Sequence, residues 1–144
     1  MPQTVIHPCL TFSGRCAEAL EFYRTALGAE TDLVMRFDES PTPPPSGTLQ
    51  SGFERKIMHA SFRIGGVTLM ATDGCDDQTK ISGMALALGL PTEAEDDQAF
   101  AALADGGTVT MPLGKTFWNP RFGMVTDRFG VAWLVSLAVA PPPL

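Results

Sequence analysis

The chain has 144 residues, and 10 Lys and Arg residues stand against 16 Asp and Glu residues, which gives a formal net charge of −6. An acidic chain without a basic run is a poor partner for nucleic acid or an anionic membrane surface. No apolar stretch is long enough to span a bilayer, and residues 1–4 lack the basic and apolar regions of a signal peptide. We therefore expect a cytoplasmic protein of a single domain.

The same order of strand and helix patterns occurs twice along the chain. In each half a strand-like run leads into an amphipathic helix pattern, and an extended segment or a hairpin follows. The predicted elements are 6–12, 15–27, 58–64 and 67–72 in the first half, and 84–90, 93–105, 108–111, 122–126 and 131–137 in the second. The repeat predicts two βαβββ modules of roughly 70 residues that share a core, since each would be marginal alone, with a cavity between them.

Capping residues mark the ends of both predicted helices. Ser13 is a candidate N-cap of the first helix, and Gly28 is a candidate left-handed terminator. Thr92 and Gly106 have the corresponding roles in the second helix.

Residues 38–56 include four prolines and cannot form a regular element. A long irregular loop of this kind is typical of a lid, a dimer arm or a mobile excursion, and Phe53 is its candidate anchor. The prolines at 141–143 are expected to end the last strand.

The three cysteines, Cys9, Cys16 and Cys75, match neither a CxxC metal motif nor a disulfide framework, so free thiols are expected. Cys16 falls at the start of a predicted helix, where the helix dipole can lower a thiol pKa. The favoured interpretation is a small core or surface residue.

Alternation along the predicted strands separates two faces of the sheet. Ala60 and Phe62 are expected under the helices, whereas His59 and Arg63 are expected on the opposite face, together with His7 of the first strand. A few polar groups in an apolar concavity are typical of a small-molecule site.

Several motifs along nearly the whole chain resemble one family. They are Leu10-Thr11-Phe12-Ser13-Gly14, Ala19-Leu20-Glu21-Phe22-Tyr23, Met58-His59-Ala60, Gly106-Gly107-Thr108-Val109, Met111-Pro112-Leu113, Thr116-Phe117-Trp118, Arg121-Phe122-Gly123 and Asp127-Arg128-Phe129-Gly130-Val131. The chain resembles the PhnB-like branch of the vicinal oxygen chelate superfamily, which includes glyoxalase I, extradiol dioxygenases and bleomycin-resistance proteins.

The resemblance implies an α+β fold, in which two βαβββ modules form a cup-shaped mixed sheet with helices on its outer face. The modules would cover about 5–80 and 81–140 within a single domain, 1–144. A homodimer is expected, with the loop 38–56 as a candidate exchanging element. Some PhnB-like proteins carry the label 3-demethylubiquinone-9 3-methyltransferase, but the chain has no Gly-rich loop between a strand and a helix for a nucleotide-type methyl donor.

Enzymes of the superfamily typically hold a divalent ion with one ligand from each of four strands. The corresponding positions here fall at His7, Met70, Ala85 and Leu134. A transition-metal site needs about three His, Cys or carboxylate ligands, so we expect no metal and no other cofactor. An ion bound by fewer protein ligands is the alternative.

His7 and His59 are the two histidines and the candidate catalytic bases. The competing interpretation for each is a hydrogen-bonded structural histidine, which is the favoured one.

Candidate ligand-binding residues come from a loop and from the strands. Phe117 and Trp118 could stack on a planar ligand while Arg121 holds a carboxylate or phosphate, or this loop could be a packing plug or a dimer contact. Arg63 could bind an anion or pair with an acid on an adjacent strand. Met70 and Met124 are candidate lining residues, although core packing is the favoured interpretation.

Two functions are therefore expected as alternatives. The first is binding of a small aromatic or anionic molecule without a metal. The second is a lyase, isomerase or dioxygenase reaction that uses a divalent ion or a histidine base.

Overall fold

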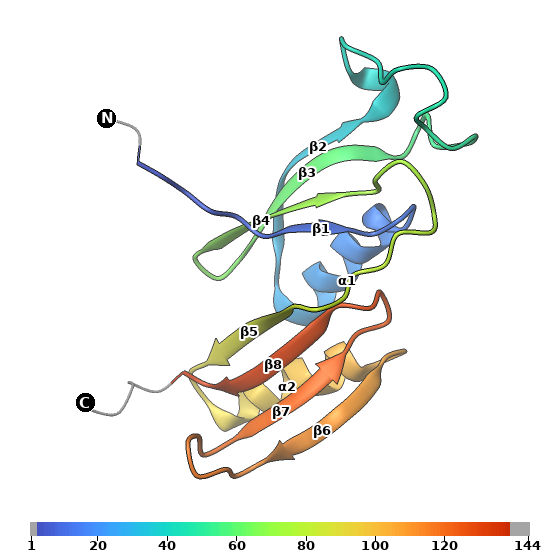
Figure 1. Cartoon of the computed structure of the whole chain (residues 1–144). Helices are drawn as coiled ribbons and strands as arrows, with labels where there is room; N and C mark the ends of the chain where they lie inside the picture. Colours follow the sequence, from blue (N-terminus) through green and yellow to red (C-terminus); the bar gives the residue numbers. More distant parts are fainter. Residues whose placement is uncertain (1–2, 139–144) are drawn as a thin grey trace. The chain divides into compact units, whose positions relative to one another are not determined.

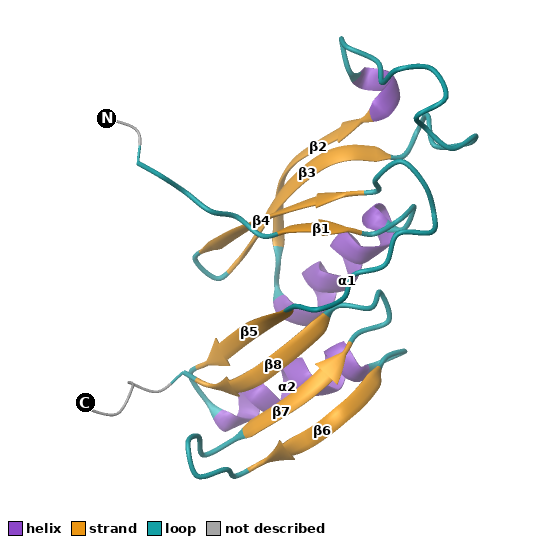
Figure 2. Cartoon of the chain, in the orientation of Figure 1, coloured by secondary structure: helices purple, strands orange, loops and turns teal. Residues whose placement is uncertain are grey.

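The computed structural model describes residues 3–138, and the chain divides into two compact units, Met1–Ile81 and Ser82–Leu144 (Figure 1). Each unit contains four strands and one helix longer than a single turn (Figure 2). In the first unit the elements are β1 Cys9–Thr11, α1 Cys16–Leu27, β2 Glu30–Arg36, β3 Ile57–Ile64 and β4 Val67–Thr72. In the second they are β5 Ala85–Leu90, α2 Glu93–Ala104, β6 Thr108–Gly114, β7 Phe122–Thr126 and β8 Ala132–Leu137.

The two sheets have the same topology. Their strand orders are β1-β4-β3-β2 and β5-β8-β7-β6. In each sheet the first strand pairs with the last in parallel, and the remaining pairs are antiparallel. The α+β fold with duplicated βαβββ units is thus confirmed, whereas the joining of the two sheets into one cup stays a prediction. The predicted residues 139–140 of the second module and the prolines at 141–143 lie outside the described residues.

Each helix covers one face of its own sheet (Figure 1). In the first unit the buried Tyr23 of α1 stacks on Phe62 of β3, with ring centroids 6.1 Å apart. In the second unit α2 lies so close to β7 that a Cβ atom at Gly123 would be 2.8 Å from the Phe100 ring. The expected burial of Ala60 and Phe62 beneath the helix is confirmed. Among residues 3–138, no helix is long and apolar enough to cross a membrane.

The cap of α1 differs from the prediction. Ser13 does not cap this helix, because the N-cap position belongs to Arg15, which makes no side-chain capping bond. The buried carboxylate of Asp73, which directly follows β4, accepts hydrogen bonds from the Cys16 N–H and the Ile57 N–H, each at 2.7 Å. One side chain thereby joins the start of the helix, the start of β3 and the end of β4. The predicted roles of Thr92 and Gly28 are confirmed.

The first strand is shorter than predicted because of Pro8. The ladder between β1 and β4 includes bonds from the Phe12 N–H to the Thr72 carbonyl and from the Met70 N–H to the Pro8 carbonyl. In such a ladder every second residue of β1 donates its N–H to β4, so counting back from Phe12 the donor after residue 10 would be residue 8. Residue 8 is a proline and has no N–H. His7 therefore lies before β1 and not within it, which corrects its predicted placement.

Candidate functional site

The sheet of the second unit has one face covered by α2 and one face without a helix, which we call the open face (Figure 2). Val125, Trp133 and Val135 are buried on the helix side. Residues that alternate with them lie on the open face, and the strand register aligns them in rows. The central row is Ala87, Leu134, Met124 and Met111, and the next row is Gly89, Ser136, Phe122 and Gly114. These two rows are therefore mostly apolar, with the Ser136 hydroxyl as their polar group, and a third row, Ala85, Ala132, Thr126 and Thr108, adds two hydroxyls at one end of the face.

An aromatic cluster lies beside these rows. The Phe117 and Trp118 rings are 4.8 Å apart, and the Trp118 and Phe122 rings are 5.4 Å apart, both with edge-to-face geometry. Phe117 is 97% exposed and Trp118 is 53% exposed, although both are large apolar side chains. Both side chains are therefore accessible within this unit, and their stacking on a planar ligand stays a prediction.

Asn119 holds the loop that carries these two aromatic residues. Its buried side chain donates to the Leu137 carbonyl at 3.1 Å and accepts from the N–H groups of Leu137 and Arg121. The Thr116 hydroxyl in turn accepts from the Asn119 N–H at 3.0 Å. The Asn119 side chain therefore fixes the loop to the end of β8, and the Thr116 bond closes the loop on itself.

Arg121 does not join the aromatic wall. Its guanidinium forms an ion pair with Asp97 of α2, in which the Nε atom donates to the carboxylate at 2.7 Å. This contact directs the side chain to the helix side of the sheet, whereas Phe122, the next residue, lies on the open face. The ion pair therefore argues against the predicted grouping of Arg121 with Trp118 around an anion, which stays a prediction.

In the first unit His59 and Met70 lie on the face opposite α1. The register places Cys9, Met70, Ser61 and Leu33 in one row, and His59 opposite Met35 in the next. His59 and Met70 are both half-buried, and His7 is half-buried in the segment before β1. Sequence reasoning had not selected three residues of these sites: Phe122, Met35 and the buried Asn119. For Phe122 the signal was available, because strand alternation places it on the open face.

Arg63 is engaged by two acids of the neighbouring strand. Its guanidinium donates to the carboxylates of Asp32 at 2.9 Å and Glu30 at 2.8 Å. The hydrogen bond to Asp32, together with the charges of Asp32 and Glu30, raises the pKa of Arg63. Of its two predicted roles, the structure supports pairing with an acid on the adjacent strand.

The residues at the four superfamily metal positions do not fit a transition-metal site. Met70 is opposite Cys9 and not His7, while Ala85 is opposite Ala132 and Leu134 is opposite Ala87. Methyl and isobutyl groups offer no ligand atom, so the β5 and β8 positions contribute none. Among residues 3–138 no group of three His, Cys, Asp or Glu residues is placed to hold an ion. That the protein has no metal stays a prediction.

Cys16 is a core residue. Its side chain is fully buried, and burial, followed by the charge of Asp73, raises the pKa of the thiol far above its ordinary value. The helix dipole does not activate this thiol, because desolvation disfavours the thiolate. Cys9 and Cys75 are exposed, and all three cysteines are free.

Asp96, in the first half of α2, is a buried acid without a hydrogen-bond partner. Neither of its carboxyl oxygens has a partner among the described residues, and the residue is fully buried. Burial raises the pKa of Asp96, Arg121 lowers it, and the charges of Asp97, Glu93 and Glu95 raise it further. The carboxyl group of Asp96 therefore stays protonated to a higher pH in the folded protein than in the unfolded chain.

Replacement Asp96→Asn is expected to stabilise the protein at neutral pH by on the order of 1 kcal/mol. An acid whose pKa is raised by folding costs stability as the pH rises above the pKa of the unfolded chain. The gain should therefore disappear below the ordinary pKa of aspartate. Urea unfolding of both proteins across this pH range measures the difference, and a gain that does not depend on pH would contradict the explanation.

Two βαβββ units of identical topology, each with a helix on one face, define the class of protein. Residues 5–135 match the Glyoxalase/Bleomycin resistance protein/Dioxygenase superfamily. The chain belongs to this superfamily.

Relatives that match nearly the whole chain support this assignment. Over 143 residues the chain is 33% identical to Protein YjdN of Escherichia coli (strain K12), covering 95% of this chain and 97% of that protein. Protein PA1353 from Pseudomonas aeruginosa is 41% identical, with a TM-score of 0.81 over 94% of this chain and 98% of that chain. A PhnB protein from Bacillus cereus, which is also named for a 3-demethylubiquinone-9 3-methyltransferase, is 30% identical, with a TM-score of 0.78 over 94% and 100%.

Proposed function

We propose that the protein binds a small aromatic molecule on the open face of the second unit, without the divalent ion usual in its superfamily. The observation that carries this proposal is the exposed ring of Trp118 against Phe122, whose row adjoins the apolar row Ala87, Leu134, Met124 and Met111. A planar ligand can stack on the indole ring and remove this apolar surface from water. The Ser136 hydroxyl offers one polar group to orient it.

An aromatic ligand is favoured over an anionic one. Both arginines considered for anion binding, Arg63 and Arg121, already pair with carboxylates. An anion would have to displace these acids. A second candidate function is catalysis with His59 as a general base. The observation in its favour is that the His59 side chain is half-buried on the face opposite α1, where it lies across from Met35.

A homodimer remains part of the proposal. Large apolar side chains are exposed on the corresponding edge strands of both sheets, Leu33 and Val34 on β2 and Val109 on β6. Exposed apolar side chains at a sheet edge favour association with another chain.

Replacement Trp118→Ala is expected to weaken binding of indole, used as a neutral aromatic probe, by about three- to tenfold. The loss follows because the variant removes the stacking surface and leaves the sheet unchanged. Indole binding is followed by chemical-shift changes of backbone amides, which should fall within 111–136. The affinity should be the same with a chelator as with added manganese or zinc.

Val109→Ala is the matched control, because it also shortens an exposed apolar side chain of this unit. Val109 is opposite the buried Val125, on the helix side of the sheet, so its variant should keep the affinity for indole. Equal affinities of the parent protein and Trp118→Ala would refute the aromatic site. If indole bound only in the presence of manganese or zinc, the enzyme alternative would be favoured. Sedimentation equilibrium of the same samples tests the homodimer.

A further inference from the structure

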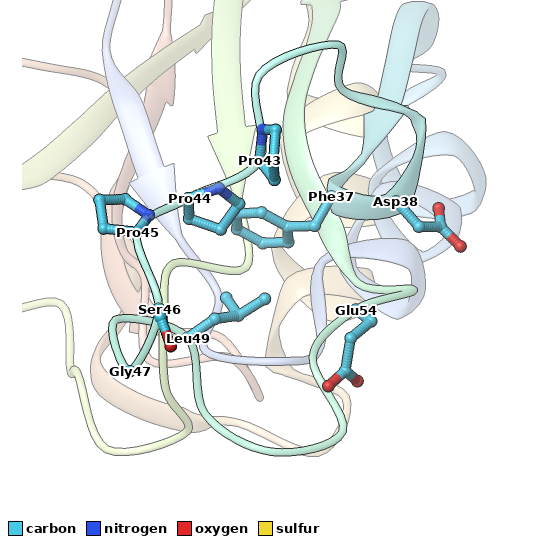
Figure 3. A pocket seen from close by; sticks show the side chains of 9 residues that line it. All are labelled: Phe37, Asp38, Pro43, Pro44, Pro45, Ser46, Gly47, Leu49 and Glu54. Carbon is cyan, nitrogen blue, oxygen red and sulfur yellow. The ribbon is translucent and has the colours of Figure 1, made fainter.

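A pocket lies in the proline-rich segment of the first unit, far in sequence from the open face. It has a volume of about 290 Å³ and is lined by Phe37, Asp38, Pro43, Pro44, Pro45, Ser46, Gly47, Leu49 and Glu54. Figure 3 shows the Phe37 ring, Pro44 and Leu49 gathered at its centre, while the carboxylates of Asp38 and Glu54 lie on the side away from Pro45. The predicted irregular loop thus lines an open pocket of its own.

Hydrogen bonds and one aromatic anchor hold the walls of this pocket. The N–H groups of Phe37 and Asp38 donate to the carbonyls of Lys56 and Glu54, at 3.1 and 2.9 Å. The Gln50 N–H donates to the carbonyl of Cys75, at 2.8 Å. Phe53 is buried, as predicted for the anchor of the loop, and its ring lies against Gly14. These contacts tie the two ends of the segment to each other, and tie its residues Gln50 and Phe53 to the rest of the unit.

The pocket is lined by apolar side chains on one part of its wall and by two acidic residues, Asp38 and Glu54, on another. Proline rings, the Phe37 ring and the Leu49 side chain present carbon atoms, and the three prolines have no N–H to offer. Asp38 is paired with Arg55 at 2.7 Å, but Glu54 is exposed and forms no ion pair with another described residue. The pocket therefore has one unneutralised carboxylate beside an apolar wall.

We propose that this pocket binds an organic cation, a small alkyl- or arylammonium ion. The apolar body of the ligand packs against Phe37, Pro44 and Leu49, and its ammonium group lies beside the Glu54 carboxylate. The net charge of −6 favours the approach of a cation. This site shares no residue with the proposed aromatic site on the open face.

The test compares three probes of similar shape: phenethylammonium, the neutral 2-phenylethanol and the anionic phenylacetate. Backbone amide shifts are expected to change within 37–54, and phenethylammonium should bind most tightly and phenylacetate most weakly. Glu54→Gln should weaken phenethylammonium about two- to fivefold, because the carboxylate is exposed and its charge is screened. The affinity for 2-phenylethanol should stay the same in this variant.

Two further variants keep the result decisive. Glu95→Gln removes the same charge from an exposed position on α2 and should leave phenethylammonium binding unchanged. Leu49→Ala removes part of the apolar wall and should weaken phenethylammonium and 2-phenylethanol alike. Equal affinities for the three probes, or no shifts within 37–54, would overturn the proposal. Shifts of phenethylammonium within 111–136 would assign it to the aromatic site instead, so each site can fail without the other.

Discussion

Replacement Asp73→Ala is expected to lower the free energy of unfolding of the first unit by about 3–5 kcal/mol. The Asp73 carboxylate accepts hydrogen bonds from the Cys16 and Ile57 N–H groups, and all three residues are buried. Alanine leaves both donors without a partner in a place that water does not reach. Hydrogen bonds to a charged group contribute roughly 1.5–3 kcal/mol each, so the loss of two accounts for the estimate.

The two units have different aromatic reporters for this measurement. Tyr23, the chain's one tyrosine, is in the first unit, and both tryptophans, Trp118 and Trp133, are in the second. Urea unfolding is therefore followed by the Tyr23 ring resonances and by tryptophan fluorescence. Asp73→Asn should cost less, since one acceptor oxygen remains, and the exposed Asp77→Ala should change stability by less than about 0.5 kcal/mol. A loss below about 1 kcal/mol in Asp73→Ala would show that another group caps α1.

Replacement Gly107→Ala is expected to destabilise the second unit by about 3 kcal/mol. A Cβ atom at this position would be 2.3 Å from the Thr126 carbonyl oxygen and 2.9 Å from the Asp127 Cα atom. Both are backbone atoms, so relief requires the start of β6 to move away from β7 and the Thr108–Thr126 pair to open. Tryptophan fluorescence during urea unfolding measures the loss.

Gly114→Ala at the end of β6, in the same unit as Gly107, is the matched control. A Cβ atom there would meet no other atom within 4 Å, so its effect should stay within about 0.5 kcal/mol. Similar stabilities of the two alanine variants would mean that the β6 and β7 backbones separate at little cost. The near contact at Gly107 would then have no structural importance.

Local patterns were sufficient to predict most of the fold, although β2, Glu30–Arg36, is absent from the predicted elements. The hairpin strands 67–72 and 122–126 have their predicted bounds, and each predicted helix differs from the observed one by one residue at one end. Alternation and helical periodicity act over a few residues, so a single sequence contains them. The first strand was predicted too long because Pro8 was not recognised as the missing donor of its ladder with β4.

Contacts between distant residues account for what the sequence did not predict. The α1 cap comes from Asp73, 57 residues after Cys16, and Arg121 is held by Asp97, 24 residues before it. The first contact joins a carboxylate to a backbone N–H and the second joins two charged side chains. In neither case does the local pattern select one partner over another. The pocket in 37–54 was also not predicted, because proline-rich composition indicates an irregular chain and does not specify the path that the chain takes.

The hydrogen bonds of Asn119 have a consequence for the chemical lifetime of the protein. Asparagine side chains commonly deamidate when the N–H of the next residue attacks the side-chain amide and forms a cyclic imide. The next residue here is Pro120, which has no N–H, so this route is closed. The amide that holds the Phe117 and Trp118 loop is thus protected from ageing by its neighbour in sequence, and the aromatic surface should keep its shape in long-stored protein.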